Sequence, residues 1–342
     1  MMRKLRKPDY TQLLKVLNKQ VPDRPTLYEF LTNWHIDRVL VSDIAKKNDG
    51  FDDLRISIQA FKAAGYDYVS LPGSDFKFET KKRDHIKTQS LNDADSISDW
   101  ESYEKYEWPN PENFDNKILD MATEEMPEGM GIVVHGNCGV FENVIALVGF
   151  DNLCMMLFDE PDLVQQIFND VGSRFVKYYD QAAQHPGVIA VMSNDDWGFN
   201  TATMLSPKDM RKYVIPWHKK IVETCHKHNK PTILHSCGQL DEVMDDIVND
   251  IKYDAKHSYQ DAIRPVEEAY EKYKGQIAVL GGIDVDFMAR STPKEIEKRC
   301  RAMIERTTKD GGYALGTGNS VPDFIPHENY FAMIDTVRFG DI

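Results

Sequence analysis

The feature that most constrains the fold is a unit that recurs along the chain: a short apolar run, a loop and a longer amphipathic segment. Short apolar runs bounded by turn residues predict strands, and apolar residues spaced three and four apart predict helices. Strands are predicted at residues 26–30, 66–71, 131–135, 189–193, 232–236, 253–257, 278–282 and 313–316. Helices are predicted at 161–179, 207–228, 240–248, 264–274, 293–308 and 328–337. Eight strands that alternate with helices predict an α/β protein of the (β/α)8 TIM-barrel class.

Two further features complete the predicted architecture. A helical extension precedes the first strand. Residues 77–116 form an excursion after the second strand, because this stretch is highly charged and carries Trp100 and Trp108. The length of 342 residues and the hydrophobic content of 42% suffice for one large core. We therefore expect a single domain that spans residues 1–342.

The overall charge argues against two classes of partner. The formal net charge is −14 at pH 7 and the basic residues are scattered, so neither nucleic acid nor an anionic membrane is expected to bind. No apolar segment follows the basic N-terminus, and no apolar run is long enough to span a bilayer. We expect a soluble cytoplasmic protein that acts on a small molecule. Its five widely spaced cysteines favour free thiols or a metal site over a disulfide framework.

Polar residues gather at the carboxyl ends of the predicted strands. In a (β/α)8 barrel these ends meet at one mouth, where active sites are built. The residues are Glu29, His135, Asp195, Asp196, Trp197, His235, Cys237, His257, Asp284, Thr317 and Asn319. Their convergence predicts a catalytic or ligand-binding pocket.

The pair His235 and Cys237 indicates the chemistry most directly. Alternate residues of a strand share a face, so the imidazole and the thiol point the same way. Both side chains are good zinc ligands, the thiol as thiolate, and Gly238 lets the backbone turn away from the strand end. A buried histidine and a buried cysteine without a joint role are the alternative. The position of the pair at a barrel mouth favours a metal site.

Several segments carry a resemblance to a known family. They are ILHSCG at 233–238, LGGID at 280–284, GGYALGTGN at 311–319, IPHEN at 325–329 and LSPKDMRKYVIP at 205–216. Over about residues 130–340 the chain resembles the uroporphyrinogen decarboxylase superfamily. Its two best-known branches are the porphyrinogen decarboxylases and the zinc-dependent methyltransferases, which move a methyl group between a corrinoid protein and a thiol such as coenzyme M. The resemblance implies a (β/α)8 barrel, in agreement with the strand count.

The two branches place different demands on the mouth. In the decarboxylase branch an arginine-rich motif follows the first strand, and its positive charge suits a substrate with many carboxylates. This chain has Glu29 near that position instead. The decarboxylases' histidine in the last strand loop is replaced by Thr317. The methyltransferase branch implies His235 and Cys237 as the first two zinc ligands. Its third ligand would fall at Thr317, and a neutral threonine is a poor zinc ligand.

Either another residue completes a metal site, or the site binds no zinc. His257 ranks first, because it ends the strand beside the one that carries His235 and Cys237. Glu29, Asp195 and Asp196 are the other candidates.

These residues predict a metal-dependent methyltransferase that moves a methyl group between a corrinoid protein or a methylated small molecule and a thiol or cobalamin acceptor. Zinc is the expected cofactor, and a corrinoid is expected as substrate or on a partner protein. Glu29, Asp195 and Asp196 are predicted to serve catalysis. Substrate contacts are predicted for His135, Trp197, Asp284, Thr317 and Asn319. The alternatives are a metal-free decarboxylase of the same superfamily and a barrel that binds a ligand without chemistry.

Overall fold

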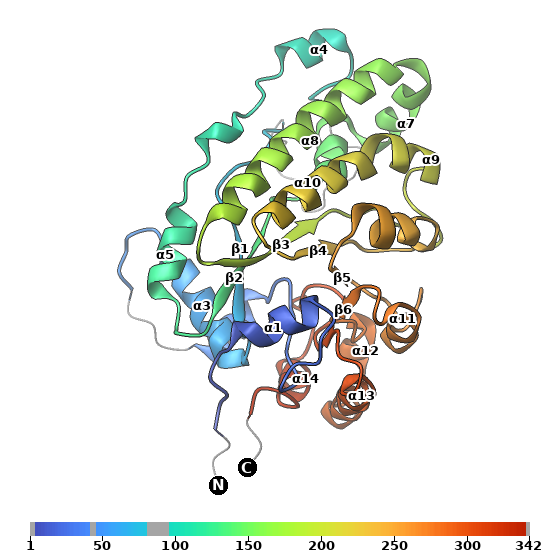
Figure 1. Cartoon of the computed structure of the whole chain (residues 1–342). Coiled ribbons are helices and arrows are strands. Elements are labelled where there is room, and N and C mark those ends of the chain that lie inside the picture. Colours follow the sequence, from blue (N-terminus) through green and yellow to red (C-terminus); the bar gives the residue numbers. More distant parts are fainter. Residues whose placement is uncertain (1–3, 42–45, 81–95, 340–342) are drawn as a thin grey trace.

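The computed structural model describes residues 4–41, 46–80 and 96–339. Its centre is a curled sheet of seven parallel strands whose order in space follows the chain (Figure 1). The strands are β1 (Tyr68–Pro72), β2 (Gly131–His135), β3 (Val188–Asn194), β4 (Thr232–His235), β5 (Ala255–His257), β6 (Ala278–Leu280) and β7 (Tyr313–Ala314). Parallel neighbours require a crossover, and helices supply it after each strand. The predicted α/β architecture with a parallel sheet is confirmed.

The first predicted strand, at residues 26–30, is reduced to a single bridge. Within the described residues the sheet therefore has seven strands and not the eight expected. Leu27 forms an isolated parallel bridge with Leu315. On the other side, the Tyr68 hydroxyl donates to the Glu29 carbonyl (2.6 Å) and accepts from the Glu29 N–H (2.7 Å). A side chain thus occupies the two backbone groups with which residue 29 would have paired to β1, which is the physical reason for the difference.

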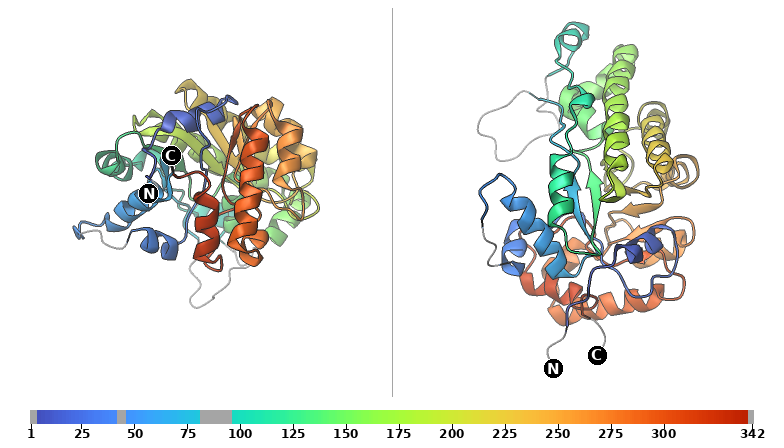
Figure 2. Two further views of the ribbon diagram at one scale, coloured as in Figure 1. Left: turned by 90° about the horizontal axis from the view of Figure 1, so that it is seen from below. Right: turned by 60° about the vertical axis from the view of Figure 1, so that its left-hand side comes forward.

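The helices cover the outer face of the sheet, as two further views show (Figure 2). Before β1 lie α1 (Tyr10–Leu17), α2 (Trp34–Leu40) and α3 (Asp52–Ala64). Between β1 and β3 lie α4 (Trp100–Lys105), the 3-10 helix η1 (Pro111–Asn113), α5 (Lys117–Glu125), α6 (Val140–Val148), α7 (Phe150–Asp159) and α8 (Pro161–Gln184). Between β3 and β5 lie α9 (Pro207–Asp209), the π-helix η2 (Met210–Val214), α10 (Ile215–Lys227), the 3-10 helix η3 (Asp241–Val243) and the π-helix η4 (Asp246–Ile251). After β5 come α11 (Val266–Tyr273), α12 (Val285–Arg290), α13 (Pro293–Thr307) and α14 (His327–Ile334).

Two predicted helices differ in kind from those observed. The pattern at 207–228 is one helical stretch, but it contains the π-turn η2. Pro216 lies just after that turn and has no N–H to continue the regular hydrogen-bond ladder. The pattern at 240–248 is a 3-10 turn followed by a π-helix, which ends at Lys252 in the left-handed conformation (φ 69°).

The excursion predicted at 77–116 is described only in part, because residues 81–95 lie outside the described ranges. Its later part runs along α8 (Figure 1). There the Tyr103 hydroxyl donates to Asp170 (2.6 Å), and Arg174 donates to the Pro109 carbonyl (3.0 Å). Within the described ranges no single helix is long and apolar enough to cross a membrane. The adjacent helices α6 and α7 reach that apolar content only together and meet at a 91° bend.

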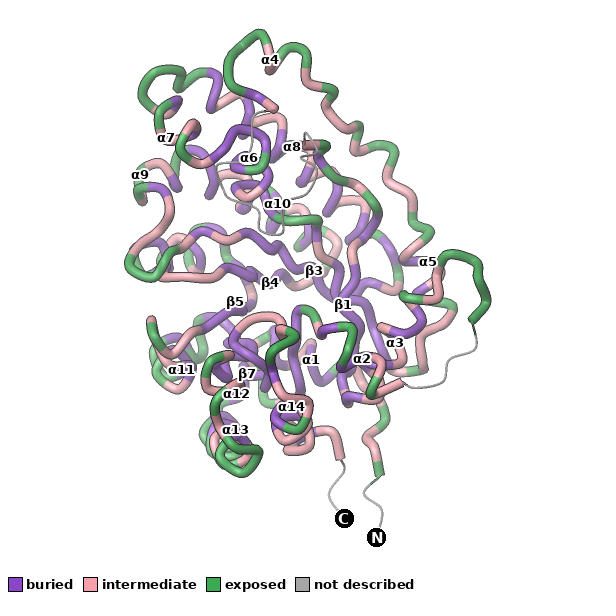
Figure 3. Tube along the Cα trace, turned by 180° about the vertical axis from the view of Figure 1, so that it is seen from behind, coloured by how far each residue is buried: buried purple, intermediate pink, exposed green. Residues whose placement is uncertain are grey.

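The core lies between the strands and the inner faces of the helices (Figure 3). Every residue of β3 is buried. Inside the curl, the Tyr28 hydroxyl reaches the Met192 sulfur (3.0 Å), so residue 28 fills the interior although its segment is not a strand. Asn194 pairs with His235, and His235 pairs with His257. This register brings the carboxyl ends of β3, β4 and β5 to one level.

Candidate metal centre

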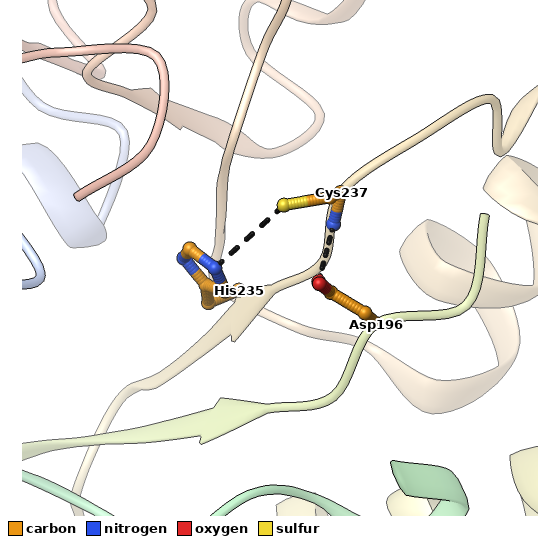
Figure 4. Close-up of side chains that lie close together, drawn as sticks. All are labelled: Asp196, His235 and Cys237. Carbon is orange, nitrogen blue, oxygen red and sulfur yellow. Dashed lines mark hydrogen bonds between the residues drawn. The ribbon is translucent and has the colours of Figure 1, made fainter. Parts of the chain in front are cut away.

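Three side chains from two neighbouring strand ends come together in the structure. Asp196 follows β3 by two residues, His235 ends β4, and Cys237 follows β4 by two residues. One ligand atom from each lies within 4.8 Å of the others (Figure 4). The Cys237 sulfur is 3.9 Å from His235 Nε2, and Asp196 Oδ1 accepts a hydrogen bond from the Cys237 N–H (2.8 Å). The shared face predicted for His235 and Cys237 is thus present at the carboxyl ends of the strands.

The donor set of this cluster fits a zinc ion. Zinc binds thiolate sulfur at about 2.3 Å and imidazole nitrogen at about 2.0–2.1 Å. These two lengths together exceed the observed 3.9 Å between sulfur and Nε2, so one ion can touch both atoms. A carboxylate oxygen is an ordinary third ligand, and three protein ligands are the usual number in catalytic zinc sites.

The Cys237 sulfur is surrounded by hydrogen-bond donors. The Ser258 hydroxyl (3.2 Å) and the Asn319 amide nitrogen (3.1 Å) both point at it. Burial, together with the charge of Asp196, raises the pKa of the thiol to about 12. Without a cation the group therefore stays protonated at neutral pH, whereas a bound cation would favour the thiolate that these donors are placed to stabilise.

His257 contacts His235 on the side away from Cys237. The two Nδ1 atoms are 2.7 Å apart, and His257 Nε2 lies 3.3 Å from the Thr317 carbonyl. Because a carbonyl only accepts, His257 Nε2 carries the proton and its Nδ1 accepts from His235 Nδ1–H. His235 Nε2 then presents its lone pair to the side of Cys237. Burial lowers the pKa of His257 to about 3 and that of His235 well below its usual range, so both rings are neutral.

This geometry bears on the choice of third ligand. His257, the first candidate from the sequence, lies behind His235, and the carboxylate beside the His235–Cys237 pair is Asp196. An imidazole held through its second nitrogen is the usual arrangement around a metal-binding histidine.

Asp195 is directed into the protein rather than toward the cluster. Its carboxylate accepts hydrogen bonds from the N–H groups of Phe141 and Glu142 (both 2.9 Å) at the start of α6. It also binds the Trp197 indole N–H (3.0 Å) and His218 Nε2 (2.8 Å). Trp197 is itself fully buried, with its ring edge-on to His218 at 4.6 Å. These contacts anchor the β3 loop to α6 and α10.

Glu29 and Thr317 form a closed pair on the opposite side of the mouth. The Thr317 hydroxyl (2.7 Å) and N–H (3.2 Å) donate to the Glu29 carboxylate, which is fully buried. Burial raises the pKa of Glu29 to about 8, although both hydrogen bonds oppose the shift. Thr317 thus contacts Glu29 through its hydroxyl and N–H, and His257 through its carbonyl.

The remaining predicted site residues have separate surroundings. His135 ends β2, and its Nδ1 donates to the Gly136 carbonyl (2.9 Å) while its buried Nε2 has no partner among the described residues. Burial lowers its pKa to about 4, so Nε2 is a free acceptor. Asp284 caps α12 by accepting from the Phe287 N–H (2.9 Å) and also accepts from the Asp261 N–H (2.9 Å).

The sequence analysis assigned no role to two further residues at the mouth. Ser258 donates to the Cys237 sulfur, and Lys256 is buried with its ammonium group against the Ser236 and Ser258 carbonyls. Both flank His257. A lysine inside a predicted strand was the available signal, since lysine is almost never fully buried without a partner.

A curled parallel sheet wrapped by helices, with a polar cluster at the carboxyl ends of its strands, defines a barrel-like α/β enzyme. The chain belongs to the uroporphyrinogen decarboxylase (URO-D) family, because the model of that family matches residues 57–339. The family expected from the sequence motifs is therefore confirmed.

Known proteins show the same relationship at low identity. The chain is similar to uroporphyrinogen decarboxylase of Paraburkholderia phytofirmans, with 26% identity over 192 residues, which are 55% of this chain and 50% of the relative. For the enzyme of Geobacter sulfurreducens the identity is 25% over 191 residues, 55% of this chain and 52% of the relative. The chain thus spans about half the length of the curated relatives it matches. A methyltransferase from Methanosarcina mazei has the same fold, with a TM-score of 0.71 at 16% identity over 95% of this chain and 97% of that one.

Proposed function

We propose that this protein is a metal-dependent methyltransferase. It moves a methyl group between a corrinoid protein or a methylated small molecule and a thiol or cobalamin acceptor. The observation that carries this proposal is the cluster of Asp196, His235 and Cys237, whose donor atoms suit zinc and lie where barrel enzymes bind substrates. The fold of the Methanosarcina mazei methyltransferase is compatible with it.

The chemistry of the proposal divides between the ion and the chain. When bound, zinc supplies the Lewis acidity that keeps a thiol substrate ionised at neutral pH. Asp196, His235 and Cys237 would hold the ion, and His257 fixes the ring of His235. In the transfer, the acceptor sulfur forms a bond to the methyl carbon. The bond from that carbon to its donor breaks with its electron pair on the donor, and the thiol proton is released to water.

The other mouth residues would handle the substrate. His135 offers an unpartnered acceptor at the end of β2, and Asn319 reaches the Cys237 sulfur from the loop after β7. Glu29 is neutral below about pH 8 and can donate a proton there. The partners that we propose are a small molecule and a corrinoid protein. Nucleic acid and anionic membranes are disfavoured by the net charge of −14.

The alternative function is a metal-free decarboxylase, which the names of the curated relatives favour. The carboxylate of Asp196 beside the His235–Cys237 pair disfavours a substrate with many carboxylates. The two functions differ in their need for metal, so metal analysis separates them.

The first experiment measures metal in the purified protein after equilibration with zinc and removal of the excess. We expect near-stoichiometric zinc in the wild type. His235→Ala and Cys237→Ser should lose it while circular dichroism and urea unfolding of the metal-free proteins stay unchanged. Cys154→Ser is the matched control, because Cys154 is also half-buried but lies on α7, away from the cluster. Zinc retained by Cys237→Ser, or absent from the wild type, would contradict the metal site.

The second experiment assays both reactions with the zinc-loaded and the metal-free wild type. Methylcobalamin is the donor and 2-mercaptoethanol the acceptor, and the change in the corrinoid spectrum reports transfer. Carbon dioxide release from uroporphyrinogen is followed in parallel. Transfer that requires zinc supports the proposal. Carbon dioxide release by the metal-free protein without methyl transfer would establish the decarboxylase instead.

A further inference from the structure

A small pocket lies immediately outside the candidate metal centre. It is lined by Lys256 of β5 and by residues that follow β4 and β5, among them Gly238, Ser258, Tyr259 and Arg264. Gly238 directly follows Cys237, and the Ser258 hydroxyl donates to the Cys237 sulfur (3.2 Å). The pocket and the metal cluster therefore share one wall. The volume open to the centres of water molecules is about 40 Å³. One water needs about 10–15 Å³ of such volume, so a group of a few atoms fits.

Lys256 brings a buried positive charge to this pocket. The residue is only 4% exposed. Its ammonium group donates to the Ser258 carbonyl (2.7 Å) and the Ser236 carbonyl (3.3 Å), which uses two of its three donors. In the described part of the chain no carboxylate lies within ion-pair distance of it, although buried charges are normally paired.

Tyr259 adds a second unsatisfied group. The residue is 8% exposed and lines the pocket, and its buried hydroxyl has no hydrogen-bond partner among the described residues. Its ring centroid lies 4.4 Å from the Lys256 ammonium nitrogen, so the two side chains are in contact. A buried hydroxyl without a partner destabilises the folded state, and a ligand in the pocket would relieve this.

The other charges of the pocket leave it net positive. Arg264 is paired with Asp241 through both of its terminal nitrogens, and one of these nitrogens also donates to the Tyr273 hydroxyl (3.2 Å). These two charges cancel, and Lys256 remains. An ammonium group, a phenolic hydroxyl and a nearby guanidinium together match an acceptor with several oxygens and a negative charge.

We propose that this pocket binds a small oxyanion, a carboxylate or a phosphate group, through Lys256 and Tyr259. The ligand would supply the missing counter-charge of Lys256. Lys256 also donates to the Ser236 and Ser258 carbonyls, which lie next to the metal cluster. A bound anion would therefore help to hold these segments in place. The site does not depend on the proposed methyl transfer.

The test is calorimetric titration of the full chain with acetate and with inorganic phosphate, each against chloride at equal ionic strength. We expect saturable binding at one site by at least one of the two, and the anion that binds shows whether the pocket takes carboxylate or phosphate. Lys256→Met should weaken the affinity by about tenfold or more, and Tyr259→Phe by several-fold, as hydrogen bonds to charged groups do. Lys272→Met is the matched control, since Lys272 lies 3.5 Å from Asp241 but does not line the pocket.

Three results would overturn the proposal. They are no saturable binding of either anion, equal binding of chloride, and unchanged affinity in Lys256→Met. If Lys256→Met does not fold, Tyr259→Phe decides, and wild-type affinity in that variant would overturn the proposal. The titration is repeated with Cys237→Ser, which should bind the anion normally, so that failure of the metal site and failure of the anion site are read separately.

Discussion

The two sides of the mouth place their carboxylates in different surroundings. On the side of residues 26–30 and β7, Glu29 is closed off by the hydroxyl and N–H of Thr317. On the side of β3 and β4, Asp196 lies beside the donor atoms of His235 and Cys237. His257 joins the sides, because it contacts His235 through one nitrogen and the Thr317 carbonyl through the other. We propose that Asp196, which follows β3 by two residues, takes the metal-ligand position for which Thr317 is unsuited.

The largest effect is expected when the hydrogen bonds that hold the loop after β3 are removed. Asp195→Ala removes the acceptor of four hydrogen bonds, three of them buried, and we expect the free energy of unfolding to fall by about 3–5 kcal/mol. Urea unfolding of the metal-free protein measures it. Asp196→Ala is the control and should change the stability by less than about 1 kcal/mol. Equal losses in the two variants would show that the neighbouring carboxylates share one structural role.

The next effect tests which side holds the metal. Asp196→Ala should weaken zinc binding at least about hundredfold, since replacement of a supporting residue alone costs about 10–100-fold. Glu29→Gln should stay within a few-fold of the wild type, because Thr317 satisfies the Glu29 carboxylate. Competition with a chelator of known affinity measures both. A larger loss in Glu29→Gln than in Asp196→Ala would reverse the comparison.

A smaller effect concerns the residue that joins the sides. His257→Phe should weaken zinc binding about 10–100-fold, because His235 loses its partner at Nδ1. His257→Gln should recover part of the affinity, since an amide can bond to the same nitrogen. Glutamine is a poor zinc ligand, so equal losses in the two variants would mean that His257 binds the metal directly.

The last effect is spread over several pH units and appears as a slope of stability against pH. The pKa of Glu29 is about 8 in the folded protein and 4.5 ordinarily. A raised pKa means that the neutral form stabilises the fold, so this contribution is complete below about pH 4.5 and is lost as the pH rises through 8. Stability should fall by up to about 1.4 kcal/mol per pH unit in that window. Glu29→Gln should remove this slope, and parallel stability curves for the two proteins between pH 5 and 9 would contradict the buried acid.

Much of the fold follows from local patterns in the sequence. Seven of the eight predicted strands are present in the predicted order, because apolar runs and crossover helices are readable without knowledge of neighbours. The exception, at residues 26–30, depends on a contact with Tyr68, which lies 39 residues away along the chain. No pattern within the segment itself reports that contact.

The site divides in the same way. The sequence by itself determined that His235 and Cys237 share a face at a strand end, because side chains alternate along a strand, and its motifs indicated the family. Only the tertiary structure decided that Asp196 lies beside them while Asp195 turns inward and His257 lies behind His235. Those positions depend on strand register and on partners from α6, α10 and the loop after β7. Such contacts between distant segments are selected by packing and hydrogen bonding across the whole fold, which residue spacing does not encode.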